Sequence, residues 1–319
     1  MLLALIRKLF LTLITLLILS FISYNILLRD PLNQLEMAGV SGYWHYVQDL
    51  LDGNLGISYI NGESLAKQIL NVFPATISLC LSALVISLVL GLPLGFFSAT
   101  QQKNLMGKFL SSLGSLSLAI PVFWLAIILL AYASINQWPI AAVGEIHPIY
   151  DTPAITGVKI LDIFFSDSPY KLKMMQSALQ HLALPAMILA IPATLETMHF
   201  TQLRTQYVLQ QNYVKVARTR GWSPLRIWRV HVVRNTLPAV IPMIARNITL
   251  IFAFALLIEN VVSWGGVGRW MINALSIQDY NAISAGVVAI GLFVLLVDLF
   301  TGMITTLLDP SQKKDWYVK

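Results

Sequence analysis

The sequence predicts an all-α membrane protein with six transmembrane helices. Of its 319 residues, 57% are hydrophobic and only 11% are charged, whereas a soluble domain carries roughly 25% charged residues. Six apolar stretches also come close to the length of about 20 residues that a helix needs to cross a bilayer. The net charge of +6 does not indicate a nucleic-acid partner, because a basic nucleic-acid binder is not this apolar.

The first predicted span follows Arg7 and Lys8 and contains no charged residue. It is too long for the core of a signal peptide and does not end in a small-x-small cleavage site, so we expect a retained signal anchor. The third stretch belongs to a segment without any charge between Lys108 and Glu145. The six predicted helices comprise residues 9–28, 74–98, 109–135, 181–203, 238–262 and 283–307.

The distribution of Lys and Arg predicts the orientation. With the N-terminus in the cytoplasm, 14 of the 21 Lys and Arg residues lie in inside segments and six in outside loops. Cytoplasmic loops carry such an excess of basic residues, so we expect both termini inside and a main cytoplasmic loop at 204–237. The outside loops hold ten acidic residues, which would attract cations, although ordinary loop chemistry accounts for them as well.

The stretch NYVKVARTRGWSPLRIWRVHVVRN, residues 212–235, holds six Lys and Arg and no Asp or Glu. It predicts two short helices with a break between them. Gly221 suits the left-handed position that ends a helix. Ser223 can cap the second helix, with Pro224 at its first position.

An apolar stripe supports a packed elbow at this place. Leu225, Trp228 and Val232 follow helical spacing along the second helix. A helix-turn-helix elbow held against the membrane would then offer Ala217 and Gly221 to a partner. A basic segment that only binds anionic lipid headgroups explains the charge equally well.

The same stretch resembles the EAA loop of the membrane-spanning subunits of bacterial ABC importers, in the dipeptide and oligopeptide permease form. Six further segments resemble that family in the same order along the chain, and some details are similar to its antimicrobial-peptide (Sap) branch. These segments are DGNLGIS at 52–58, FPATISL at 73–79, GLPLG at 91–95, IPVFW at 120–124, GVGRW at 266–270 and QDYNAISAG at 278–286.

The resemblance implies a type I importer core at about 74–302, preceded by a span and a periplasmic loop in 1–73 and followed by a cytoplasmic tail at 303–319. It implies that the elbow is a coupling helix docked on a separate cytoplasmic ATPase. A second homologous permease, two ATPases and a periplasmic substrate-binding protein would complete the assembly. The residues expected to couple to the ATPase are Ala217, Arg218, Gly221, Trp222 and Ser223.

Chemistry of its own is not expected of this chain. A GxxxxGK[ST] phosphate loop is missing from the sequence, so ATP would be bound by the partner ATPase, with no cofactor here. The five histidines are scattered and Cys80 is the single cysteine, which indicates neither a catalytic set nor a metal site.

Three charged residues fall inside predicted spans, namely Glu196, Arg246 and Asp298. Charges in a bilayer are costly and are functional candidates by default. Counting residues from the inner ends of the spans places all three at a similar depth. We therefore expect Arg246 to pair with Glu196 or Asp298, either as a static strut between helices or as a moving gate.

The sequence thus predicts a permease subunit of a peptide importer in a bacterial inner membrane, with cationic antimicrobial peptides as candidate substrates. Another polycation such as a polyamine is an open alternative, given the acidic outside loops. A self-contained secondary transporter or channel would need internal repeats, and a membrane scaffold would leave the intramembrane charges without a role.

Overall fold

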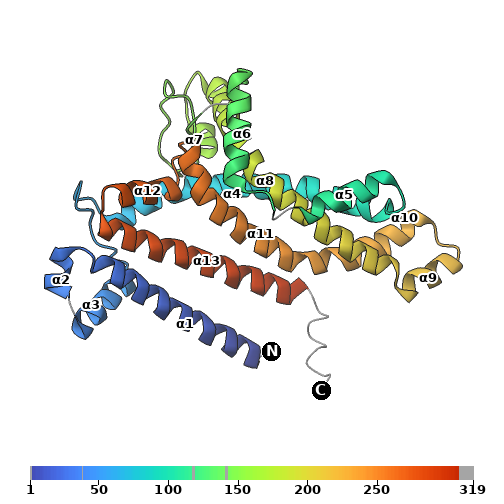
Figure 1. The fold of residues 1–319 in the computed structure, drawn as a ribbon, viewed down its shortest axis with the longest axis horizontal. Helices are drawn as coiled ribbons and strands as arrows, with labels where there is room; N and C mark the ends of the chain where they lie inside the picture. The colour runs from blue at the N-terminus through green and yellow to red at the C-terminus, as the bar shows by residue number, and fades with distance from the viewer. Residues whose placement is uncertain (1, 38, 117–118, 141–142, 309–319) are drawn as a thin grey trace. The chain divides into compact units, whose positions relative to one another are not determined.

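The structure is a computed structural model that describes residues 2–37, 39–116, 119–140 and 143–308 (Figure 1). Within these ranges the chain forms helices, apart from one isolated antiparallel bridge between Ile57 and Ser64. This confirms the all-α class. The predicted tail at 303–319 is described only to the end of the last helix at Leu308.

Five helices are long and apolar enough to cross a membrane, which makes the chain a multi-pass membrane protein. They correspond to five of the six predicted spans and extend beyond most of the predicted bounds, because helical structure continues into the more polar residues beside the apolar stretches. The five are α1 (Leu2–Leu27), α4 (Leu65–Thr100), α8 (Lys171–Leu209), α11 (Arg234–Val261) and α13 (Tyr280–Leu308).

The predicted single helix over 109–135 is wrong. The segment divides into α5 (Leu105–Ser115) and α6 (Val122–Ile135), with Pro121 in an extended conformation between them. Proline disfavours the helical conformation of the residue before it and lacks the N–H that a helix interior needs. At 14 residues, α6 is shorter than the roughly 20 that a perpendicular span requires.

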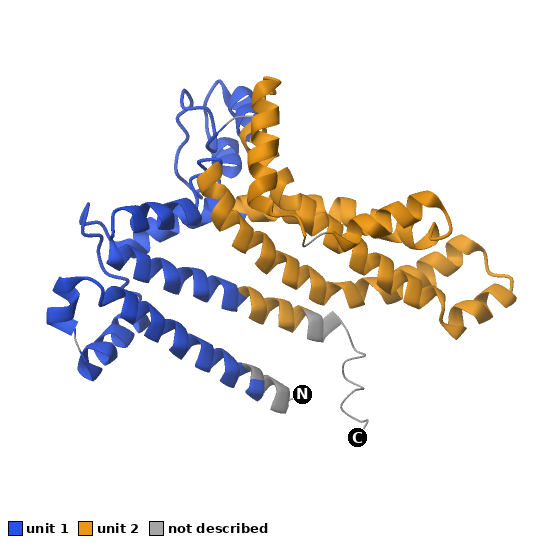
Figure 2. Cartoon of the chain, in the orientation of Figure 1, with its two compact units in different colours: residues 1–77, 143–178, 262–296 blue, residues 78–142, 179–261, 297–319 orange. Residues whose placement is uncertain are grey.

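The remaining helices are short, and the chain divides into two compact units, each with its own internal contacts (Figure 2). Unit 1 comprises residues 1–77, 143–178 and 262–296, and unit 2 comprises residues 78–142, 179–261 and 297–319. The short helices are α2 (Pro31–Met37), α3 (Val40–Leu51), α7 (Lys159–Phe165), α9 (Asn212–Thr219), α10 (Pro224–Ile227), the π-helix η1 (Trp228–Val233) and α12 (Val267–Ser276).

In unit 1, a buried polar node joins three helices. The hydroxyl of Ser23 on α1 lies 2.8 Å from that of Ser284 on α13. Tyr46 of α3 donates to Ser23 at 2.8 Å. Since Ser23 is fully buried, these bonds satisfy a hydroxyl that would otherwise be stranded among apolar side chains.

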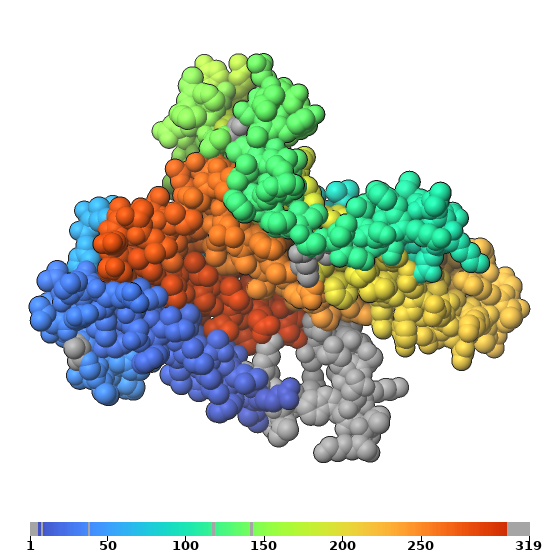
Figure 3. Space-filling view, in the orientation of Figure 1, coloured from blue at the N-terminus to red at the C-terminus, as the bar shows by residue number. Residues whose placement is uncertain are grey.

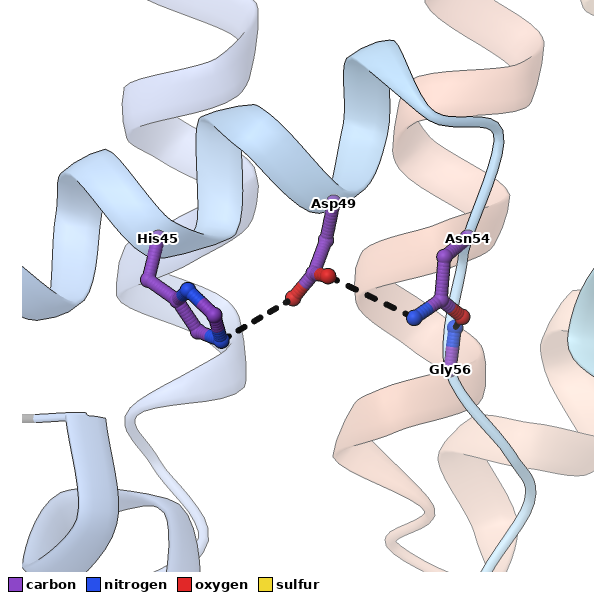
Figure 4. Close-up of polar contacts among 4 residues, drawn as sticks. All are labelled: His45, Asp49, Asn54 and Gly56. Carbon is purple, nitrogen blue, oxygen red and sulfur yellow. Dashed lines mark hydrogen bonds and ion pairs between the residues drawn. The ribbon is translucent and has the colours of Figure 1, made fainter.

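Side-chain hydrogen bonds define a turn in the segment at 52–58 of unit 1. Figure 4 shows Asp49 between two partners: Nε2 of His45 lies 3.9 Å from one carboxylate oxygen, and the amide of Asn54 lies 3.4 Å from the other. Oδ1 of Asn54 accepts from the N–H of Gly56 at 3.0 Å. Further on, Ser58 donates to Asp279 at 2.6 Å, so the segment is tied to the residue that precedes α13.

Unit 2 contains a close approach between α4 and α8. A Cβ on Gly91 would lie 2.7 Å from Cβ of Thr197, and one on Gly95 would lie 2.6 Å from Cβ of Thr201 and 2.7 Å from the carbonyl oxygen of Met198. Glycine at spacing i, i+4 allows two helix backbones to approach in this way. The short α5 also packs on α8, where a Cβ on Gly114 would lie 3.0 Å from Cβ of His199. In the space-filling view, the atoms of α5 adjoin those of the later part of α8 (Figure 3).

We expect Gly95→Ala to destabilise unit 2, because the added methyl group meets a backbone oxygen that cannot move aside. Overpacking of this kind costs about 1–3 kcal/mol. Thermal unfolding of the purified protein in detergent measures the effect. Leu90→Ala is the control, since Leu90 lies on the same helix and is exposed. An equal shift in the two variants would contradict the close approach.

Candidate functional site

The predicted elbow lies in unit 2, where α9, α10 and η1 connect α8 to α11. Gly221 adopts φ +75°, the left-handed conformation expected of a residue that ends a helix. Its N–H donates to the carbonyl of Arg218 at 3.0 Å. Ser223 then accepts from the N–H of Arg226 at 3.4 Å, with Pro224 at the first position of α10. The helix break and its cap are confirmed.

The elbow has a small hydrophobic core of its own. Val214 and Ala217 of α9 pack with Ile227 and Val232, and all four are buried. The sequence predicts that Ala217 faces a partner. Its side chain is only 4% exposed and packs inside the elbow instead. Its part in coupling stays a prediction, and it would act there by fixing the angle between the two short helices.

The predicted apolar stripe is wrong at Leu225, which is 78% exposed. The buried side chains are those of Ile227 and Val232, which are five residues apart. A π-helix has i→i+5 hydrogen bonds, and η1 covers Trp228–Val233. The π-turn therefore brings Ile227 and Val232 to the same side, where α-helical spacing would have selected Leu225 with Val232.

Stacked side chains stiffen the break. The guanidinium of Arg226 lies 4.2 Å from the ring centroid of Trp222. The ring of Trp222 stacks on that of His231, with 5.3 Å between the ring centroids and an interplanar angle of 18°. The ring centroid of Tyr213 lies 5.5 Å from that of the same His231. The ladder spans α9, the turn and η1. Cation–π and aromatic contacts each contribute about 0.5–1.5 kcal/mol, so they help to hold α9, the turn and η1 together.

The elbow is also fixed to the end of a long helix and presents its charges outward. Trp228 meets Phe96 of α4 edge to face at 5.1 Å. Each Lys and Arg residue between 212 and 235 is exposed. Of the five predicted coupling residues, Arg218, Gly221 and Ser223 are exposed, Trp222 is half-buried in the ladder and Ala217 is buried.

The second set of predicted residues lies along the long helices of unit 2. Arg246 of α11 forms an ion pair with Glu196 of α8. The side chain of Glu196 is 4% exposed and that of Arg246 is 51% exposed, and the guanidinium also lies 5.3 Å from the ring centroid of Phe200. Asp298 of α13 is exposed. The geometry makes Glu196 the partner of Arg246, and the role of the three charges stays a prediction.

Asn247, next to Arg246, was missed by the sequence reasoning. It is 1% exposed, and its amide nitrogen donates to the carbonyl of Ala193 at 3.3 Å and to the hydroxyl of Thr197 at 3.0 Å. The sequence prediction rested on charged residues in the spans, and the side chain of asparagine is neutral. The available signal was an asparagine inside a span, where polar groups are expensive.

The long apolar helices, with the elbow between α8 and α11 and the ion pair of Glu196 with Arg246, are those of a multi-pass membrane protein. Residues 91–314 match the family described as binding-protein-dependent transport system inner membrane component. The match covers more than half of the chain, so the protein belongs to this family of ABC permeases.

The relatives are similar over almost the whole chain. The peptide transport system permease protein SapB of Haemophilus influenzae is 45% identical over 306 residues, which is 95% of each chain. The protein of the same name from Salmonella typhimurium is 37% identical over 98% of this chain and 97% of its own. The putrescine export system permease protein SapB of Escherichia coli K12 is 35% identical with the same coverage.

The π-helical register predicts unequal effects of two neighbouring substitutions. We expect Ile227→Ala to loosen the elbow, since a large-to-small change in a core costs about 2–5 kcal/mol. Leu225→Ala is the matched control because its side chain is exposed. Limited trypsin digestion, with cleavage mapped by mass spectrometry, should cut the 212–235 segment faster in Ile227→Ala only. Faster cutting of Leu225→Ala would contradict the π-helical register and support the α-helical stripe that includes Leu225.

Proposed function

We propose that the protein is a permease subunit of an ATP-driven ABC importer for peptides and forms half of a transmembrane pathway. A second homologous permease would supply the other half, with two ATPases at the cytoplasmic side and a substrate-binding protein at the periplasmic side. Both termini would lie in the cytoplasm, with α6 as a sixth, shorter crossing after the turn at Pro121. The chain itself would bind no ATP.

The elbow is the observation that carries this proposal. A segment that only attracted lipid headgroups would need charge, and would not need the capped break at Ser223 or the ladder of Arg226, Trp222 and His231. A packed elbow with an exposed basic surface suits docking on an ATPase whose movements it would transmit. We therefore assign Arg218, Gly221 and Ser223 to the docking surface, with Trp222 and Ala217 behind it.

The substrate class rests on the relatives, two of which carry peptide transport in their names and one putrescine export. Peptides and putrescine share primary ammonium groups, and the ten acidic residues of the outside loops favour cations in general. Peptide import is the first candidate. Polyamine transport, in either direction, is the second because one relative bears that name.

Other classes have less support. A self-contained secondary transporter would run without a motor subunit, and membership of a binding-protein-dependent family argues against that. A scaffold without transport would retain an ion pair inside the bilayer at a cost that serves nothing.

Gly221→Asp is expected to remove the ATPase from the complex. At φ +75° a side chain is strained, and a carboxylate would enter the docking surface. The measurement is copurification of the permease with an ATPase encoded beside it. Gly53→Asp is the matched control, because Gly53 has φ +76° and, like Gly221, open space around a Cβ. Binding that survives Gly221→Asp unchanged would contradict the coupling role.

Proteoliposomes distinguish the two substrate classes. With the assembled complex, we expect ATP-dependent uptake of labelled cationic peptide that unlabelled peptide suppresses and putrescine does not. ATP-dependent movement of putrescine that peptide leaves unchanged would select the polyamine alternative. Movement of either compound without ATP would contradict the ABC mechanism.

A further inference from the structure

The interior of unit 2 contains a small, mostly apolar cavity beside two polar side chains. Glu196 and Asn247 line it together with Ala193 and apolar side chains of α8 and α11. Its volume is about 10 Å³, and a volume of roughly 10–15 Å³ holds one water-sized group. The cavity therefore has room for one small polar group.

One of the two polar side chains has an oxygen without a hydrogen-bond donor. Both side-chain bonds of Asn247 come from its nitrogen, which Ala193 and Thr197 hold in place. Its Oδ1 is buried and has no hydrogen-bond partner. Beside it, the carboxylate of Glu196 only accepts. A buried acceptor without a donor costs about 1–3 kcal/mol, so this arrangement favours a ligand that donates and carries positive charge.

A primary ammonium group fits that requirement. It has three donors, no acceptor and a compact charge, and its size is close to that of water. A neutral hydroxyl would add an acceptor where acceptors are already in excess. An anion would be repelled by Glu196. The site thus discriminates by charge and by the direction of its hydrogen bonds.

The guanidinium of Arg246 is the existing counter-charge of Glu196, and its side chain is only partly enclosed. Its side chain is half exposed while that of Glu196 is almost fully buried. The ring of Phe200 offers a second resting place for the guanidinium, with 5.3 Å between them already. If Arg246 leaves the carboxylate, its guanidinium can therefore keep a favourable contact with the ring of Phe200.

We propose that Glu196 and Asn247 form a binding site for a primary ammonium group of the transported substrate, and that Arg246 neutralises Glu196 when substrate is absent. Substrate binding exchanges one cation for another at Glu196, so the charge of the site stays balanced throughout. This proposal rests on the proposed transport function and specifies its substrate class: compounds with a primary amine, whether a peptide or a diamine.

Chemical rescue tests the exchange. Arg246→Met keeps an unbranched side chain and removes its charge, which leaves Glu196 without this counter-ion. In the full chain, purified in lipid nanodiscs with its associated subunits, we expect 1,4-diaminobutane to raise the melting temperature of Arg246→Met by roughly 5 °C. The isosteric 1,4-butanediol should not raise it. The diamine should have a smaller effect on the wild type, where Arg246 competes.

The double variant Glu196→Gln/Arg246→Met should respond to neither compound. Glu63→Gln, at an exposed acidic residue of the outside loop, should leave the rescue unchanged. Equal effects of diamine and diol, or a diamine effect that survives in the double variant, would overturn the proposal.

Wild type and Glu196→Gln provide the test if Arg246→Met does not fold. The diamine-specific shift of the wild type should vanish in Glu196→Gln, and its persistence would overturn the site. The assay requires neither ATP nor an intact elbow. A failed rescue in a protein whose elbow still binds its ATPase would remove the ammonium site and leave the proposed function standing.

Discussion

The hydrocarbon of a bilayer offers no hydrogen-bond partner, and this constraint governs where the chain places its polar groups. Each backbone group in a span must be satisfied within its own helix, which explains the length of α4, α8 and α11. Polar side chains have to meet one another or stay at the ends. Ser23 with Ser284 in unit 1, and Asn247 with Thr197 in unit 2, follow that rule.

The same constraint explains how much of the molecule its sequence reveals. Apolar stretches identify five long helices because length and composition alone decide them. The turn at Gly221, Ser223 and Pro224 is equally readable, since each residue has a local conformational reason to be there. The partner of Arg246 is different: counting residues gave its depth, but two acids shared that depth and only the packing of α8 on α11 selected Glu196.

Two features escaped the sequence because they depend on competition between local and tertiary forces. The stretch at 109–135 is apolar throughout, yet Pro121 interrupts it and two helices result. In the elbow, α-helical spacing favours Leu225, whereas the core of α9 and Phe96 is filled by Ile227 and Val232. A π-turn costs some hydrogen-bond quality, and burying Ile227 and Val232 together offsets that cost.

The π-turn also joins the elbow to α11 without a loop. Two residues, Gln210 and Gln211, separate α8 from α9, whereas α10, η1 and α11 follow one another without a loop. Trp228 in η1 and Arg246 in α11 are therefore joined by continuous helix over about 27 Å at 1.5 Å per residue. In the proposed coupling, a displacement at α10 would be transmitted along this helix toward Arg246 and Asn247, while Glu196 belongs to α8 on the other side of the elbow. Relative motion of α8 and α11 would therefore separate Arg246 from Glu196. Such a separation is costly, because a buried carboxylate tolerates the loss of its counter-charge only when another cation replaces it.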